Sequence, residues 1–231
     1  DHLMRKSLKL HNVDFLVLDE ADRMLDMGFS VQIDQIIKHL PKKRQTLLFS
    51  ATMPKSIVNI ANQYLTDPVR VAVDDKIVPA ANVKQEIVHV TQREKYDKLI
   101  DQLEQREGSV IIFVKTKISA DRLTSNLRDD GHLADTIHGD LRHTKRERVI
   151  KSFRNRKFRV MVATDIAARG LDIPHIEHVI NYDLPQCPED YVHRIGRTAR
   201  AGRSGESLCF VTAADGDKWY AINRLINPDS P

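Results

Sequence analysis

Cysteine is scarce in this chain, and the features that would place it outside the cell or in a membrane are missing. Only Cys187 and Cys209 occur in 231 residues, and they lack the spacing of metal ligands. Nothing resembles a signal peptide, and no apolar run is long enough to cross a bilayer. We therefore expect no membrane partner and a reducing, cytoplasmic setting.

A second absence concerns nucleotide binding. The chain has no glycine-rich loop with Lys and Ser or Thr that could cradle phosphates. It also begins with Asp1-His2-Leu3-Met4, a pattern more typical of the end of a helix than of the start of a protein. We expect a fragment.

The overall composition is that of a globular protein with room for two modest cores. Hydrophobic residues make up 41% of the chain and charged residues 29%. The 36 Lys and Arg exceed the 32 Asp and Glu by only four, so a basic face requires that the charges segregate. This gives weak support for a nucleic-acid partner.

The segment from Val13 to Asp22 is a short apolar run that ends in three carboxylates, Asp19, Glu20 and Asp22. It predicts a buried strand that delivers acids to the carboxyl edge of a parallel sheet, where ligands bind. Adjacent carboxylates there suit a hydrated Mg²⁺ on a nucleotide phosphate and a base for water. An ordinary strand followed by a helix with an acidic first turn explains the same ten residues equally well.

The rest of the first part alternates helices and strands. A helix is predicted over 30–40, a strand over 45–49 that runs into Ser50-Ala51-Thr52, a helix over 55–64 and a strand over 69–73. The hydroxyls of Ser50 and Thr52 suit a phosphate or a neighbouring acid, and helix capping by Thr52 is an equal alternative. Residues 74–86 lack periodicity and predict a linker between domains 1–73 and 87–231.

The second part repeats strand and helix in alternation, which predicts a parallel sheet covered on both faces. Strands are expected at 87–91, 109–114, 133–137, 159–163, 178–182 and 208–212, with helices between them and a closing helix at Trp219. Polar groups follow these strands. Arg194, Arg197 and Arg200 fall three apart, so we expect a guanidinium row for phosphate oxygens; a solvated basic face is the alternative.

These motifs together resemble those of the DEAD-box ATP-dependent RNA helicases, and the chain is most similar to the bacterial type. Asp19-Glu20-Ala21-Asp22 matches the motif that names the family, Ser50-Ala51-Thr52 the third motif, and 162–172 and 193–200 the fifth and sixth. The resemblance implies an α/β fold with RecA-like parallel sheets. It implies the end of the first helicase domain followed by a complete C-terminal helicase domain.

The resemblance also implies roles for the residues, with ATP and Mg²⁺ as cofactors bound between two domains. Asp19 and Glu20 would hold the metal, with Glu20 also orienting or deprotonating the attacking water. Asp22 would accept a hydrogen bond from the third motif or from His193, and Ser50 and Thr52 would couple hydrolysis to domain closure. The nucleotide would also meet Asp172 at its ribose and Arg197 and Arg200 at its γ-phosphate.

RNA is the partner that the resemblance implies, as a single-stranded backbone gripped without reading of the bases and as a duplex to be unwound. Four positions match phosphate-backbone contacts of the family: Thr116, Gly139, Arg146 and Thr164. Helix capping is an alternative for Thr116 and Thr164. The further cations between 145 and 159 fit a solvated basic helix better than an RNA contact.

Two departures from the family pattern stand near these sites. His143 replaces the usual Gln three residues before Arg146, which puts an RNA contact at 143 in doubt. Ala199 replaces a more frequent Gly between Arg197 and Arg200, where its methyl group would restrict the approach of the loop to ATP. A second function stays open for the 231 residues alone, namely a non-catalytic RNA-binding or partner-docking module.

Overall fold

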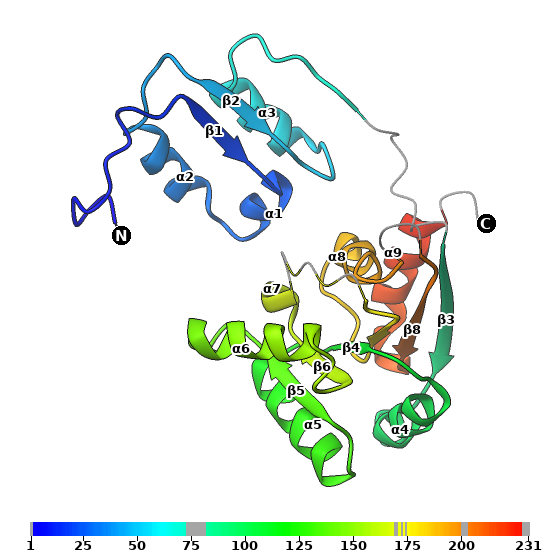
Figure 1. The fold of residues 1–231 in the computed structure, drawn as a ribbon. Coiled ribbons are helices and arrows are strands. Elements are labelled where there is room, and N and C mark those ends of the chain that lie inside the picture. Colours follow the sequence, from blue (N-terminus) through cyan, green and yellow to red (C-terminus); the bar gives the residue numbers. More distant parts are fainter. Residues whose placement is uncertain are drawn as a thin grey trace. The chain divides into compact units, whose positions relative to one another are not determined.

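The computed structural model describes residues 2–72, 82–168, 171, 173, 175–199 and 203–227. The chain divides into two compact units, Asp1–Asp75 and Lys76–Pro231. Each has its own parallel sheet with helices (Figure 1). Within the described residues no helix is both long and apolar enough to span a membrane. The α/β class with parallel sheets is thus as predicted.

The first unit is a small sheet of two strands with three helices. Its elements are β1 (Phe15–Leu18), α1 (Ala21–Asp26), α2 (Ser30–Ile37), β2 (Gln45–Leu48) and α3 (Lys55–Tyr64). β1 and β2 pair in parallel, with Phe15 opposite Gln45. Leu18, Ile33 and Tyr64 form the centre of the core of this unit.

The strand predicted over 69–73 is not formed where the structure describes it. Residues 69–72 have no regular structure, and Val73 lies outside the described residues. Val69 and Val71 are 89% and 83% exposed. A strand needs a neighbour for its backbone hydrogen bonds. The described sheet of this unit contains only β1 and β2, and neither pairs with the segment.

The second unit contains six parallel strands in the order β3-β8-β7-β4-β6-β5. The elements in chain order are β3 (Val83–His89), α4 (Lys95–Gln105), β4 (Val110–Phe113), α5 (Lys117–Asp129), β5 (Ala134–Ile137), α6 (His143–Arg154), β6 (Val160–Ala163), α7 (Asp165–Ala168), β7 (His178–Asn181), α8 (Pro188–Ile195), β8 (Gly205–Val211), a 3₁₀ turn (Ala213–Asp215) and α9 (Gly216–Ile226).

Alternation along the strands divides the core of the second unit between the two faces of the sheet. Val110 and Ile112 of β4 pack with α4 and α5, whereas Ile111 and Phe113 pack with α6 and α7. A third cluster joins α8 and α9 to β8. All four residues of β4 are buried, as expected for a central parallel strand.

Strand β3 starts earlier than predicted, because part of the expected linker belongs to it. Lys84, Gln85 and Glu86 lie in β3, which is an edge strand that pairs only with β8. Edge strands commonly carry charged side chains, so these residues gave no apolar alternation to recognise.

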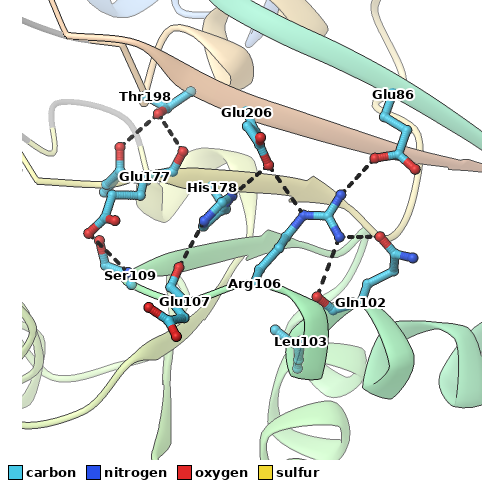
Figure 2. A network of polar contacts seen from close by, with 12 residues as sticks. Glu86, Gln102, Leu103, Arg106, Glu107, Ser109, Glu177, His178, Thr198 and Glu206 are labelled. Carbon is cyan, nitrogen blue, oxygen red and sulfur yellow. Dashed lines mark hydrogen bonds and ion pairs between the residues drawn. The ribbon is translucent and has the colours of Figure 1, made fainter.

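Polar side chains tie the strands together at the amino end of the sheet (Figure 2). Arg106, just after α4, contacts Glu86 of β3 at 2.7 Å and Glu206 of β8 at 3.7 Å. His178 of β7 lies 3.3 Å from the same Glu206 and 2.8 Å from the carbonyl oxygen of Glu107. The polar groups at this end are therefore engaged with one another, and the candidate site residues follow the strands at the opposite, carboxyl end.

Candidate nucleotide and RNA sites

Asp19 and Glu20 lie at the carboxyl end of β1, as predicted. Glu20 has a left-handed backbone (φ 51°, ψ 48°), so the chain turns directly from β1 into α1. Its backbone N–H donates to Oδ1 of Asp19 at 2.9 Å. Asp19 is exposed and Glu20 half-buried, which leaves both carboxylates accessible at the strand end. A left-handed non-glycine residue is energetically costly and typical of functional sites.

Asp22 is the buried member of the acidic motif, and hydrogen bonds join it to Ser50 and Thr52. The backbone N–H and the hydroxyl of Thr52 both donate to Oδ2 of Asp22, at 2.8 and 2.9 Å. Oγ of Ser50 accepts from the N–H of Asp22 at 3.2 Å and donates to the carbonyl of Thr52 at 2.7 Å. Of the two partners expected for Asp22, the third motif is therefore present.

These hydrogen bonds set the protonation of Asp22. Burial by itself would raise the pKa of this carboxyl, but the hydrogen bonds from Thr52, Arg23 and Ser50 stabilise its charged form and together lower the pKa. Asp22 is therefore an anion at neutral pH that connects the ends of β1 and β2. Thr52 does not cap α3, since the N-cap position is Pro54.

The four predicted RNA residues lie at or near one edge of the second sheet. Thr116, Gly139 and Thr164 follow β4, β5 and β6, which are neighbours in the order β4-β6-β5. Backbone hydrogen bonds cross between these strand ends, from Thr164 to Ile137 and from Val114 to Ala163. The fourth residue, Arg146, lies on α6 and donates through Nη2 to the carbonyl of Ala167 on α7, at 2.9 Å.

The side chains at this edge differ in how they are used. Oγ1 of Thr116 accepts from the N–H of Ser119 at 3.1 Å, so the helix-capping alternative describes its contacts. Gly139 has no left-handed backbone, and a Cβ added there would meet nothing within 4 Å. Neither turn strain nor packing requires glycine at 139. His143 is exposed and lies 3.6 Å from Glu147, one helical turn away.

The expected row of three guanidinium groups is wrong for Arg194. Its side chain is 2% exposed and makes a bidentate ion pair with Asp165, at 2.6 and 2.8 Å. It also donates to Oδ1 of Asn181 and lies 4.9 Å from the centre of the Phe113 ring. Spacing by threes placed Arg194 on one side of the segment, but it could not show that this side faces the core.

Arg197 lies just after α8 and is half-buried. Its Nε lies 3.3 Å from the carbonyl of His193, and its Nη1 3.2 Å from the carbonyl of Leu171. The fifth and sixth motifs therefore meet here. Asp172 and Arg200, the other predicted nucleotide ligands of this unit, lie outside the described residues.

Two family models match the chain, one to each part. A model described as DEAD/DEAH box helicase matches residues 1–60, and one described as Helicase conserved C-terminal domain matches 94–202. The chain is 46% identical over 225 residues to the DEAD-box ATP-dependent RNA helicase CshA of Bacillus cereus and 44% identical to that of Bacillus subtilis. The chain belongs to the DEAD-box helicase family.

These CshA relatives are longer than the chain. The matches cover 97% of the chain but 43% and 46% of the relatives, so it spans less than half their length. Among solved structures, S. cerevisiae Dbp5 bound to RNA and ADP BeF3 is 34% identical with a TM-score of 0.90, covering the whole chain and 61% of Dbp5. A DEAD box protein from Methanococcus jannaschii is 42% identical with a TM-score of 0.62, covering 98% of the chain and 61% of its own.

The structure adds residues to this DEAD-box chain that sequence reasoning missed. Asp165 neutralises Arg194, and Asp183 pairs with the buried Lys95 at 2.7 Å. The partners lie 29 and 88 residues apart in the sequence, so no local pattern could have joined them. The only available signal was their position, since Asp165 and Asp183 both follow buried strands.

Proposed function

We propose that the chain supplies the catalytic acids and the second domain of an ATP-dependent RNA helicase that unwinds or remodels RNA duplexes. The observation that carries this proposal is the pairing of Asp22 with Ser50 and Thr52 directly behind Asp19 and Glu20. Two strand ends are linked there by an anion that the hydrogen bonds keep ionised. A shift of Ser50 or Thr52 on domain closure would therefore move Asp22 and, with it, the adjacent Asp19 and Glu20.

The donor set at the end of β1 fits Mg²⁺. The ion prefers oxygen ligands and is usually bound by one or two carboxylates, with waters and substrate phosphates completing its shell. Asp19 and Glu20 supply such carboxylates, and the described residues contain no group of three His, Cys, Asp or Glu that would form an all-protein metal cage. When bound, the metal would neutralise charge on the phosphates, while Glu20 would accept a proton from the attacking water.

In the second unit, Arg197 and Arg200 are proposed to compensate charge on the γ-phosphate and Asp172 to bind the ribose. This proposal is supported by the contact of Arg197 with the carbonyl of Leu171, the residue that precedes Asp172 in the sequence. His193 is proposed to lie at the same nucleotide site, on the last turn of α8.

RNA is proposed to run along the carboxyl ends of β4, β6 and β5, with Thr116, Gly139, Arg146 and Thr164 at its phosphates. Open space over Gly139 supports this, because close approach of a ligand is a remaining reason for glycine there. Hydroxyls, backbone N–H groups and arginine are suitable phosphate donors that carry no base information. The cytoplasm remains the proposed location.

The 231 residues alone are proposed to bind RNA without hydrolysing ATP. The sequence has no phosphate-binding loop, so a triphosphate would lack its main cradle. In this form the chain would act as a non-catalytic RNA-binding module, and it would take part in catalysis when such a loop is supplied.

ATP hydrolysis by two proteins tests the function. The first is the chain itself, and the second is the chain preceded by the corresponding N-terminal part of the Bacillus cereus relative. We expect RNA-stimulated turnover only in the second, and its loss in Glu20→Gln with ATP and RNA binding preserved, because the amide cannot act as a base. Asp14→Asn, directly before β1, is the matched control and should keep full activity. Unchanged turnover in Glu20→Gln would refute the assignment.

A further inference from the structure

A cleft of about 300 Å³ opens on the second unit between α4 and α5, and none of the residues discussed for ATP or RNA lines it. Gln92 and Tyr96 contribute one wall, from the segment after β3 and the start of α4. Ser119, Arg122, Leu123 and Asn126 contribute the second wall from α5. Tyr182 and Asp183, directly after β7, form the third.

The cleft continues the proposed RNA edge. In the sheet order β7-β4-β6-β5, the proposed RNA residues follow β4, β6 and β5, and the cleft residues Tyr182 and Asp183 follow the next strand, β7. Thr116 donates from its hydroxyl to Oγ of Ser119, a cleft residue one turn farther along α5. The backbone N–H of Lys115 donates to Oδ2 of Asp183 at 3.0 Å. A strand held at Thr116 therefore has the cleft as its next neighbour.

One face of α5 carries both the proposed phosphate position and residues of the cleft. Thr116, Ser119, Arg122 and Asn126 are spaced three, three and four residues apart, which places them in line on a helix. In the described part of the chain, the guanidinium of Arg122 makes no hydrogen bond or ion pair and is exposed. A free cation that follows a phosphate-binding position is suited to the next phosphate of the same strand.

The walls of the cleft are aromatic and amide-bearing. Tyr96 and Tyr182 supply rings, and burial raises the pKa of Tyr182 to about 12, so its ring is neutral at physiological pH. The Tyr182 ring is held by the ammonium of Lys95, 4.6 Å from its centre. Rings of this kind stack on unpaired bases, and side-chain amides hydrogen-bond to base edges.

Asp183 is the acidic group of the lining, and its position is fixed. Oδ1 accepts from Nζ of Lys95 at 2.7 Å and Oδ2 from the N–H of Lys115. Each carboxylate oxygen can accept a further hydrogen bond. A fixed carboxylate favours a donor, such as the exocyclic amino group that cytosine has and uracil lacks.

We propose that this cleft binds one unpaired nucleobase with an exocyclic amino group, from the nucleotide that follows the phosphates held at Thr116. The inference rests on the proposed RNA function and deepens it, since a base pocket would add base preference to a grip that otherwise reads only the backbone.

The test measures binding of the 231-residue chain to three single-stranded RNA decamers of equal length and charge: oligo(C), oligo(U) and a fully abasic strand. A backbone grip alone predicts equal affinities. With a base in the cleft we expect oligo(C) to bind about tenfold more tightly than the abasic strand, within the range found for stacking of one base. Oligo(U) should fall between them.

Two variants of Tyr96 form a matched pair. Its hydroxyl donates to Oδ2 of Asp130 at 2.6 Å, and both Tyr96→Phe and Tyr96→Leu lose that bond, but only the second loses the ring. Tyr96→Phe should keep the preference for oligo(C), and Tyr96→Leu should bind oligo(C) no better than the abasic strand. Arg122→Gln should weaken binding of all three decamers, whereas Arg148→Gln on α6, of equal charge change, should not. Thermal unfolding of each variant checks that it is folded.

Arg146→Gln separates this inference from the proposed function. If it weakens all decamers and the three bind the wild-type chain alike, the phosphate edge stands and the base pocket is overturned. If oligo(C) is preferred and Arg146→Gln has no effect, the base pocket is supported and the proposed phosphate contacts along the sheet edge are refuted. Absence of binding to every decamer would overturn both. If oligo(C) and oligo(U) bind equally, and both more tightly than the abasic strand, the proposal that Asp183 recognises an exocyclic amino group is overturned.

Discussion

Strands β1 and β4 look alike as sequences but differ in what covers them. Each has four apolar residues and is followed by polar groups, yet β4 is buried on both faces, whereas Phe15 and Val17 of β1 are 64% and 55% exposed. Leu16 and Leu18 face the core of the first unit. Continuous apolar runs are typical of strands covered on both sides. The sequence of β1 is therefore that of a strand covered on both faces. Among the described residues, only the face with Leu16 and Leu18 packs against a core.

This contrast matters because burial of apolar surface stabilises the folded state by roughly 25 cal/mol for each Å², and surface left in water forgoes that stabilisation. The core of the first unit is built on Leu18, Ile33 and Tyr64, whereas each face of the second sheet has a larger cluster. We therefore expect the unit with the proposed catalytic acids to be the less stable one, and the unit with the proposed RNA edge to be the more stable one.

The largest difference is expected in hydrogen exchange. In the dilute chain, the amides of residues 16–18 should exchange at least about a thousandfold faster than those of 111–113, which corresponds to about 4 kcal/mol of opening free energy. Exchange measured by mass spectrometry on peptides that cover both strands gives the comparison within one sample. Equal protection would show that the first unit is as stable as the second and would remove the contrast.

A pair of phenylalanines tests the same contrast by substitution. Phe113 is 1% exposed and Phe15 is 64% exposed. Phe113→Ala should cost about 3–5 kcal/mol of unfolding free energy because it leaves a cavity under Arg194. Phe15→Ala should stay within about 0.5 kcal/mol. For Phe113→Ala, chemical denaturation of the second unit is followed by the fluorescence of Trp219. For Phe15→Ala, hydrogen exchange in the first unit measures the effect. A large cost for Phe15→Ala would mean that its face is covered.

Elements with strong local signals could be predicted from the sequence. The helix over 55–64 follows Pro54 and carries its apolar residues at helical spacing, and the structure has it at the same bounds. The central strands β4 and β6 are runs of apolar residues and were found within two residues. What failed depended on distant partners. Residues 69–72 have strand-like side chains, but neither of the two strands described in their unit pairs with them. Arg194 has a partner 29 residues away.

The same division applies to the candidate site. The carboxylates after β1 and the polar groups after β4, β5 and β6 were predictable, because the carboxyl ends of parallel strands share one edge. The resemblance implies the third motif or His193 as the partner of Asp22, and the structure shows hydrogen bonds from Thr52 of that motif. The cleft beside α5 was not predictable, since its walls come from three elements that only the fold brings together.

An acid titration should act on the first unit through Asp22. Its pKa is lowered in the folded state, so the stabilisation is fully present above the pKa of the unfolded chain, near 4, and is lost as the pH falls through the folded value. Asp22→Asn should cost about 1–3 kcal/mol at neutral pH, by weakening charge-assisted hydrogen bonds, and should flatten this pH dependence.

Exchange at residues 16–18 between pH 3 and pH 6, corrected for the intrinsic rate, measures the effect. Asp14→Asn changes an exposed acid of the same unit and should leave the profile as in the unsubstituted chain. An unchanged profile in Asp22→Asn would contradict the role of the Thr52 hydrogen bonds.

The smallest effect concerns backbone strain. Each unit has a residue with a left-handed backbone within a family motif. Glu20 and Ala199 adopt left-handed conformations, with φ of 51° and 56°. For a residue with a Cβ this costs roughly 1–2 kcal/mol, and glycine avoids the cost. Replacing Glu20 by glycine would remove this strain but also the carboxylate. Ala199 has no such role, so glycine at 199 would remove the cost of the left-handed backbone.

Ala199→Gly should therefore stabilise the second unit by up to about 1 kcal/mol, because the relief of strain is partly offset by lost contacts of the methyl group with the cluster around Tyr191 and by the greater freedom of glycine in the unfolded chain. Ala120→Gly, in the buried interior of α5, is the opposite control and should destabilise by about 1 kcal/mol or more. Denaturation midpoints of the two variants should thus move in opposite directions. A shift of both to lower denaturant would show that the methyl group of Ala199 contributes more than its backbone costs.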